Sequence, residues 1–209
     1  MPRFLHTCTG EFEWHPDPDK VTYAILSHVW RKPEDGGEQS YDDVREIQAA
    51  ANESRKKSQS SPSDAAQPTA YHEEMPVTIF ALPGLSDKIK SFCKVAREAG
   101  FLLAWNDACC IDKTSSAELS EAINCMYEWY QLSDMCYVYL ADVPDGIVRE
   151  GNSFLFQKSK WHLRGWTLQE LIAPERIVFL TNNWNVLGTK MGLAKTLEAI
   201  TGVDFDILI

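Results

Sequence analysis

The chain has 209 residues, enough for one α/β domain with a sizeable core. Hydrophobic residues make up 44% and charged residues 24%, which is ordinary for a soluble globular protein. The formal charge of -10 argues against a general nucleic-acid or anionic-membrane binder, because phosphate binding needs a positive field. We therefore expect one folded domain over residues 1–209 that binds neither nucleic acid nor membrane.

The targeting and cysteine patterns favour a cytoplasmic protein. No apolar run approaches the roughly 20 residues that span a bilayer, and the N-terminal MPRFLHTCTGEFEW contains no signal-peptide core. The six cysteines include no CxxC pair and no regular framework, so neither a zinc ribbon nor a disulfide scaffold is indicated. We expect free thiols in a reducing cytosol and no metal site.

The first half of the chain predicts a strand, an insertion and a helix. Residues 21–27 (VTYAILS) are β-rich and almost continuously apolar, which is typical of a strand covered on both faces. Residues 50–74 are rich in Ala, Ser, Gln and Pro with almost no apolar anchors, so we expect a flexible surface insertion. From Pro83, apolar residues at helical spacing predict a helix that Gly100 ends.

The second half predicts further strands and helices in alternation. Apolar segments predict strands at residues 101–105, 135–140 and 176–180. Ser115 and Glu118 form a capping-box pattern, in which the hydroxyl and the carboxylate together close the first turn of a helix. Two more helices are expected, at residues 164–174 and 190–200.

This alternation predicts an α/β fold, with a mostly parallel sheet and helices on both of its faces. Ligands bind such sheets at the carboxyl ends of the strands. The polar residues at those ends are therefore candidates for a site, namely Ser27 and His28, Asn106 and Asp107, and Asp142.

Two stretches at predicted strand ends carry reactive side chains. In YAILSHVW, Ser27 and His28 could meet a ligand, or Ser27 could cap the turn with His28 as an ordinary loop histidine. In WNDACCIDK, a nucleophilic pair of Cys110 with His28 is conceivable because cysteine catalysis needs a nearby base. The alternative is that Cys109 and Cys110 are simply buried.

The stretch RGWTLQELIAP, residues 164–174, places an aromatic ring beside a carboxylate. Trp166 and Glu170 are i and i+4 on the expected helix, so they share a face, and the ring can desolvate the carboxylate and raise its pKa. Such a pair can bracket a sugar, although the spacing also fits a core Trp and a solvated Glu. Lys158, Lys160 and Arg164 form a basic cluster that could hold a small phosphorylated ligand.

Three blocks, YAILSHVW, WNDACCIDKTSSAELSEAINCMYEWY and RGWTLQELIAP, resemble the signature blocks of the fungal heterokaryon-incompatibility (HET) domain. They occur in the family's order and, with their flanks, cover nearly the whole chain. The chain departs from the family pattern at Arg31, where Gly is common, and at Asn106, where an apolar residue is usual. The resemblance implies a single HET domain that acts as a programmed cell-death effector when incompatible fungal cells fuse.

The HET domain is in turn distantly similar to TIR domains, which have a flavodoxin-like parallel sheet. Some TIR domains cleave NAD with a glutamate that follows a Trp by four residues, as Glu170 follows Trp166. The resemblance thus implies an NAD glycohydrolase with Glu170 as catalytic carboxylate, NAD as substrate and no bound cofactor. Substrate-binding roles are implied for the remaining candidates, Trp166, Ser27, His28, Asp107 and Arg164.

A second function from a different class stays open. Many TIR domains act without catalysis, as adaptors that signal cell death by self-association. TIR-type enzymes also commonly complete their sites between protomers, so a homo-oligomer is expected on activation. HET domains often stand at the N-terminus of larger proteins, which implies regulatory domains as further partners.

Overall fold

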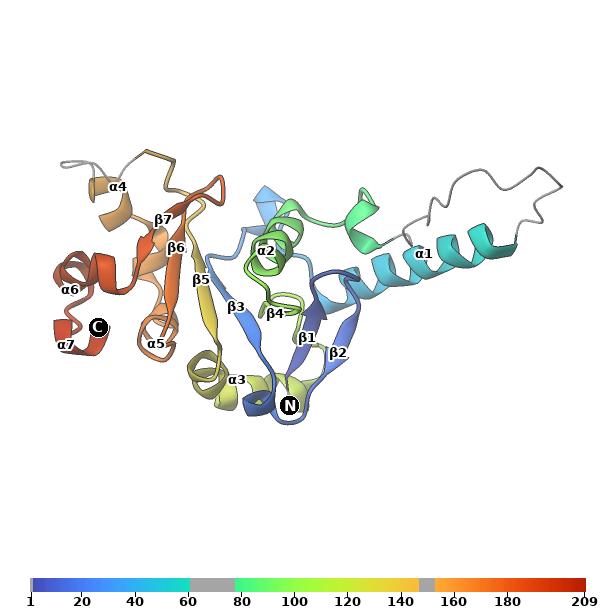
Figure 1. Ribbon diagram of the computed structural model, residues 1–209, viewed down its shortest axis with the longest axis horizontal. Helices are drawn as coiled ribbons and strands as arrows, with labels where there is room; N and C mark the ends of the chain where they lie inside the picture. Colours follow the sequence, from blue (N-terminus) through green and yellow to red (C-terminus); the bar gives the residue numbers. More distant parts are fainter. Residues whose placement is uncertain (1, 61–77, 147–152) are drawn as a thin grey trace.

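The structure is a computed structural model that describes residues 2–60, 78–146 and 153–209. Its centre is a seven-stranded sheet in the order β2-β1-β4-β3-β5-β6-β7 (Figure 1). The strands are β1 (Arg3–His6), β2 (Phe12–Trp14), β3 (Tyr23–His28), β4 (Leu103–Trp105), β5 (Met135–Tyr139), β6 (Ile177–Leu180) and β7 (Val186–Thr189).

The middle of the sheet is parallel and its edges are antiparallel. Strands β4, β3, β5 and β6 pair in parallel, which confirms the expected α/β fold with a mostly parallel core. The antiparallel strands β1, β2 and β7 were not predicted. These strands have only three or four residues each and lie at or next to an edge, so they lack the continuous apolar run of a central strand.

Consecutive residues of the central strands point to opposite faces of the sheet. In the register of β3 and β5, Ser27 is level with Val138, and His28 with Tyr139. Because side chains in register on neighbouring strands share a face, Ser27 lies on the face of Val138 and His28 on the face of Tyr139. The two polar residues that end β3 therefore face different helices.

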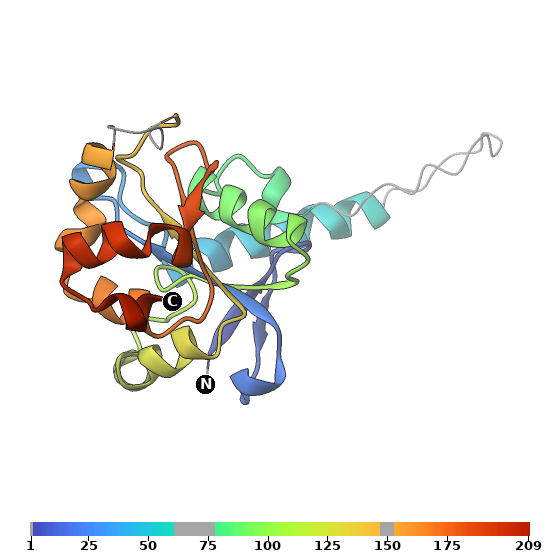
Figure 2. The same cartoon turned by 60° about the vertical axis from the view of Figure 1, so that its left-hand side comes forward.

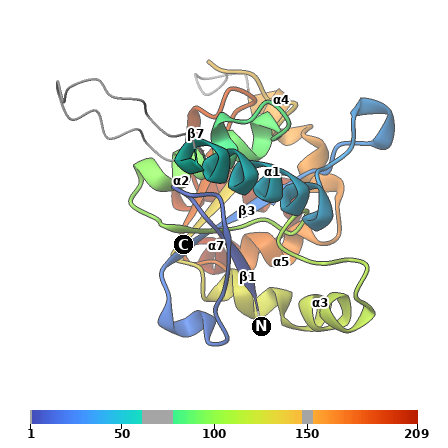
Figure 3. The ribbon, with the colours of Figure 1, turned by 90° about the vertical axis from the view of Figure 1, so that its right-hand side faces the viewer.

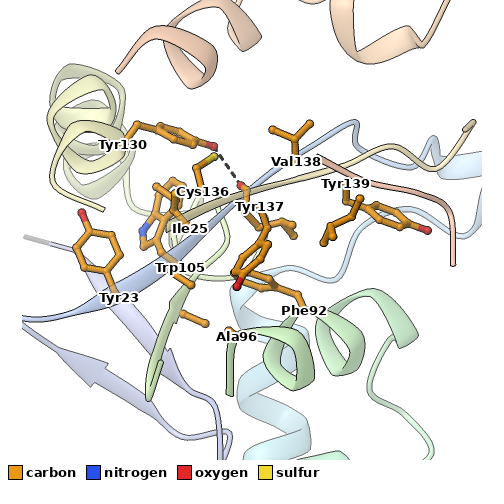
Figure 4. Packing of buried hydrophobic residues seen from close by; sticks show 14 of the residues in the cluster. Tyr23, Ile25, Phe92, Ala96, Trp105, Tyr130, Cys136, Tyr137, Val138 and Tyr139 are labelled. Atoms are coloured by element: carbon orange, nitrogen blue, oxygen red, sulfur yellow. Dashed lines mark hydrogen bonds between the residues drawn. The ribbon is translucent and has the colours of Figure 1, made fainter. Parts of the chain in front are cut away.

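Helices cover both faces, as expected (Figures 1 and 3). Helix α2 (Asp87–Glu98) packs on one face, where the ring centroids of Phe92 and Tyr137 are 6.4 Å apart. Helix α3 (Ser116–Gln131) packs on the other, where the Tyr130 hydroxyl donates to the Leu26 carbonyl at 3.1 Å. Figure 4 shows these two sets of buried side chains, with the strands running between them.

The remaining helices lie around this core. Helix α5 (Thr167–Ile172) is on the α3 side, and α6 (Ala194–Thr201) fits the last helix expected from the sequence. Three helices were not predicted, namely the long α1 (Tyr41–Ser60) and the short α4 (Ser153–Gln157) and α7 (Phe205–Leu208). Among the described residues, no helix is long and apolar enough to cross a bilayer.

Part of the expected surface insertion is helical. Helix α1 (Tyr41–Ser60) includes residues 50–60, so that part of the expectation is wrong, while residues 61–74 lie outside the described residues. Val44, Gln48 and Ala51 are buried at helical spacing and anchor the first half of the helix. The second half extends away from the sheet (Figure 2).

The capping box of α3 is only half formed. Ser115 Oγ accepts a hydrogen bond from the Glu118 N–H at 3.3 Å, as expected. The Glu118 carboxylate does not return to the cap, because it accepts from the Asp112 N–H at 2.9 Å and from Arg3 at 3.0 Å. Arg3 is buried, and it also donates to the Cys110 carbonyl at 3.4 Å. The guanidinium of β1 thus holds the loop between β4 and α3.

Arg3→Met should lower the free energy of unfolding by about 3 kcal/mol, because it leaves the Glu118 carboxylate without its buried partner. Urea denaturation followed by circular dichroism measures this change. Arg45→Met is the matched control, since Arg45 also lies over the Tyr41 ring but is exposed. The control should change stability by less than about 0.5 kcal/mol. Equal effects of the two substitutions would contradict the anchoring role of Arg3.

Candidate active site

The carboxyl group of Glu170 is buried beside the end of β3. Only 7% of this residue is exposed, and the Ser27 hydroxyl donates a hydrogen bond to the carboxylate. Ser27 Oγ in turn accepts from the indole Nε1 of Trp161 at 2.7 Å. Because Trp161 occupies the acceptor side of the hydroxyl, the Ser27 proton is directed at Glu170.

Burial raises the pKa of Glu170 to about 7. The charge of Asp107 acts in the same direction, whereas the Ser27 hydrogen bond and the charge of Arg164 act against it. The apolar setting therefore dominates a polar contact that by itself would favour the ionised form. Glu170 titrates close to neutral pH, as acid–base residues of enzymes do.

Glu170 lines a cavity of about 200 Å³. Trp166, Asp107 and Arg164 line the same cavity, so the structure brings together four of the candidate residues. Trp166 precedes the first turn of α5, where its carbonyl accepts from the Glu170 N–H at 3.4 Å, and half of this residue is exposed. The remaining lining comes from the loop after β3 and from the region of α3, namely Trp30, Ile111, Lys113, Leu119, Ile123 and Met126.

The second carboxylate of the cavity, Asp107, is held by hydrogen-bond donors. Its Oδ1 lies 3.0 Å from His28 Nε2, and its Oδ2 accepts from Trp30 Nε1 at 2.9 Å. Burial opposes ionisation of Asp107, but the hydrogen bonds from His28 and Trp30, with the charge of Lys113, outweigh burial and lower its pKa. The two carboxylates of one cavity thus have pKa values shifted in opposite directions.

His28 is held from both sides of its ring. On one side, Nε2 faces the acceptor oxygens of Asp107 and Asn106. On the other, Nδ1 lies 3.0 Å from Lys88 Nζ, which comes from α2, on the face of the sheet opposite to Glu170. The surroundings therefore assign the ring proton to Nε2 and leave Nδ1 as an acceptor.

Lys88 is buried with three acceptors around its amine. Nζ donates to His28 Nδ1, to the Val29 carbonyl at 3.2 Å, and to the Glu38 carboxylate. Three acceptors require the three protons of an ammonium group, although burial lowers the pKa of Lys88. Glu38 supplies the countercharge that keeps this buried ammonium stable.

Ser27 and His28 do not line the cavity themselves. They lie behind it, each in contact with one of the two carboxylates that do. Arg164 also reaches this strand end, since its Nη1 donates to the His28 carbonyl at 3.2 Å.

The basic cluster of the sequence does not assemble at the cavity. Neither Lys158 nor Lys160 lines it, and only Arg164 of the three is present. Asp142 also lies elsewhere, because it accepts from the Ser159 hydroxyl at 2.7 Å and from the Lys160 N–H at 2.8 Å. Asp142 thus joins the segment after β5 to the residues just before Trp161.

The adjacent cysteines are packed in the core. Cys110 Sγ accepts from the Asn106 N–H at 3.4 Å, whereas both ring nitrogens of His28 are taken by other groups. A hydrogen bond to Cys110, together with burial, raises the pKa of Cys109 well above its usual value. The candidate nucleophile Cys110 is buried, and neither ring nitrogen of His28 is left to act as its base, so the geometry favours the buried interpretation.

The two departures from the family pattern lie next to the site. Asn106 Oδ1 lies 3.1 Å from His28 Nε2 and accepts from the Ala108 N–H at 3.0 Å, whereas its Nδ2 is buried without a hydrogen-bond partner among the described residues. The Arg31 N–H donates to Glu38 at 2.7 Å, a backbone contact that does not depend on the side chain. Both substitutions leave the strand ends intact.

Sequence reasoning missed five residues of this arrangement, namely Trp30, Glu38, Lys88, Lys113 and Trp161. Lys88 did carry a signal, because it precedes Phe92 by four residues and so lies on the apolar face of its helix. A lysine there needs a buried partner. Trp161 lies in the short 3₁₀ helix Lys160–Leu163 and Glu38 in an irregular segment, and neither is long enough for a periodicity that marks a buried side chain.

Comparison with known proteins places the chain in a family. The family model of the heterokaryon incompatibility protein (HET) matches residues 23–154, more than half of the chain. The chain belongs to the HET family. It is 35% identical over 190 residues to the vegetative incompatibility protein HET-E-1 of Podospora anserina, covering 89% of this chain. The match spans 12% of that relative's length, and no solved structure matches the HET domain described here.

Glu170→Gln should stabilise the domain at alkaline pH. The folded-state pKa of about 7 exceeds the ordinary glutamate value of 4.5, so the folded protein binds more protons than the unfolded chain and loses stability as pH rises between these values. At pH 8 the variant should gain up to about 3 kcal/mol, and at pH 4 almost nothing. Thermal melts across this range test the expectation. Glu98→Gln, at a side chain that is 63% exposed, should show no such gain, and a pH-independent effect of Glu170→Gln would refute it.

Proposed function

We propose that this HET domain is a cell-death effector of fungal heterokaryon incompatibility that hydrolyses NAD at the bond between nicotinamide and ribose. The observation that carries the proposal is the buried Glu170 carboxyl at a cavity that also presents Trp166. The name of the Podospora relative supports the setting, because that protein is a vegetative incompatibility protein. The chemistry is supported by the geometry of the cavity.

The bond to be broken leaves positive charge on the sugar. As nicotinamide departs with the electron pair of the C–N bond, the ribose gains oxocarbenium character at C1′ and its ring oxygen. A fixed carboxylate close to this charge stabilises it, most strongly where water is excluded. Glu170 in its ionised form suits that role, and its carboxylate oxygens could also accept hydrogen bonds from the ribose hydroxyls.

The carboxylates and the Trp166 ring of the cavity can contact a cationic aromatic ring. Nicotinamide in NAD carries a positive charge, and the cavity offers the carboxylates of Glu170 and Asp107 with the indole ring of Trp166. The cations Lys113 and Arg164 also line the cavity, and the Lys113 ammonium lies 4.9 Å from the centroid of the Trp30 ring. Aromatic faces attract cations, and they also stack on planar rings. Arg164 supplies a guanidinium that could pair with the diphosphate.

The cavity is smaller than the whole substrate. Pockets for drug-sized ligands usually measure about 300–1,000 Å³, so about 200 Å³ suits the nicotinamide riboside end alone. Arg164 also lines a second cavity of about 310 Å³, next to His162 and Gly165. The adenosine half would lie over Arg164, in this second cavity or against another protomer, so assembly would favour turnover.

Purified domain, concentrated or tethered to force assembly, should consume NAD and release nicotinamide. Glu170→Ala and Glu170→Gln should lower kcat roughly 10²- to 10³-fold, because the charge that stabilises the transition state is lost. Chromatography of NAD, nicotinamide and ADP-ribose measures the reaction. The control is Glu98→Gln, which should keep full activity. Folded domain without turnover in any assembled state would contradict the proposal.

The rate should depend on the ionisation of Glu170. Because the carboxylate is the active form and its pKa is about 7, kcat/KM should rise with pH and level off above that value. The pH profile of kcat/KM between pH 5 and 9 measures this limb. A rate that falls as pH rises through 7 would mean that the protonated acid is the active form.

A non-enzymatic adaptor that signals by self-association is the second candidate. It is favoured by apolar side chains exposed outside the cavity of Glu170, with Leu163 82% and Phe154 60% exposed. Exposed apolar residues grouped on one side of a domain can mark an interface with another protein. The NAD assay on assembled protein separates the two functions, since an adaptor would assemble without consuming NAD.

A further inference from the structure

The carboxylate of Asp107 keeps free hydrogen-bond acceptor positions at the cavity. Its carboxylate oxygens each have one donor from the protein, His28 Nε2 and Trp30 Nε1. A carboxylate accepts about four hydrogen bonds, so each oxygen keeps a lone pair for another partner. The side chain is 21% exposed, and Asp107 lines the cavity together with Glu170.

We propose that Asp107 is the general base that activates the attacking water, and that Glu38 and Lys88 position it through His28 from the opposite face of the sheet. The inference rests on the proposed NAD hydrolysis and adds the group that completes it. The two carboxylates then have different roles. Glu170 would stabilise the positive charge on the sugar, while Asp107 would accept the proton of the attacking water.

The C–N bond to nicotinamide breaks, and nicotinamide leaves neutral with the electron pair. The water oxygen then bonds to C1′ of the ribose while its proton passes to Asp107. The protonated Asp107 returns this proton to solvent, so the products are ADP-ribose, nicotinamide and one proton.

The surroundings of the two carboxylates agree with separate roles. Hydrogen bonds from His28 and Trp30 and the charge of Lys113 lower the pKa of Asp107 against the effect of burial, so it is ionised at neutral pH and can accept a hydrogen bond from a water molecule. Glu170 lies in the more apolar setting, with only a hydroxyl as direct partner. Pairs of acidic groups whose environments differ in this way commonly divide catalytic tasks.

The chain Glu38–Lys88–His28–Asp107 fixes the orientation of the base. Lys88 donates to His28 Nδ1, so the ring proton lies on Nε2 and points to Asp107. Without that donor, Nδ1 could carry the proton instead and Nε2 would face Asp107 as a second acceptor. Burying a lysine and a glutamate contributes little net stability compared with an apolar pair, so their presence calls for another role.

The test compares two acceptors for the same sugar intermediate. Hydrolysis requires a base, whereas 3-acetylpyridine attacks through a ring nitrogen that carries no proton. Assembled domain is given NAD with and without 3-acetylpyridine, and both ADP-ribose and the exchanged dinucleotide are measured. Asp107→Asn should lower hydrolysis about 10²-fold or more while the exchange reaction persists. Glu170→Gln should lower both reactions.

The outcomes separate the two proposals. Neither reaction in the unaltered domain would overturn NAD cleavage and this inference together. Hydrolysis in the unaltered domain, with Asp107→Asn lowering both reactions equally or neither, would overturn the role of Asp107 alone. Thermal melts of each variant establish that it is folded.

A second variant tests the positioning role away from the cavity. The pair Glu38→Gln with Lys88→Met removes both charges at similar volume, so the fold should be retained. We expect the ratio of hydrolysis to exchange to fall about 10-fold, within the 10²-fold effect of losing the base itself. The ¹⁵N chemical shifts of His28 should show its proton moving from Nε2 towards Nδ1. An unchanged ratio with an unchanged tautomer would overturn the role of Lys88.

Discussion

The pleat of one parallel strand organises the candidate active site. At the end of β3, Ser27 and His28 must point to opposite faces, because successive side chains of a strand alternate. Ser27 contacts Glu170 on the α5 side, and His28 is held by Lys88 on the α2 side while its other ring nitrogen reaches Asp107. Two adjacent residues thus connect both helical layers to one cavity.

The two carboxylates of the cavity differ because their neighbours differ. Glu170 is buried with a hydroxyl as its direct partner, and desolvation raises its pKa. Asp107 is surrounded by donors and by the charge of Lys113, which lower its pKa in spite of burial. At one pH the two carboxyl groups can therefore differ in protonation state. The spacing of these residues along the chain does not reveal this difference.

The supporting interactions are as buried as the site. Arg3 of the first strand holds the loop that carries Asp107, through the Cys110 carbonyl and Glu118. Trp161 orients Ser27, and Glu38 neutralises Lys88. Each of these charged or polar groups costs free energy to bury. Because they are hydrogen-bonded to one another, removing one of them leaves its partner buried without a hydrogen bond.

The sequence by itself determined the parallel core, the helices α2, α3, α5 and α6, and the spacing of Trp166 and Glu170 by one helical turn, because apolar periodicity is a local property. It also placed Asp107 at a strand end. Only the tertiary structure decided that Lys88 meets His28 and that Trp161 meets Ser27. These contacts join segments distant in the chain, and no local pattern encodes the partner of a buried polar group.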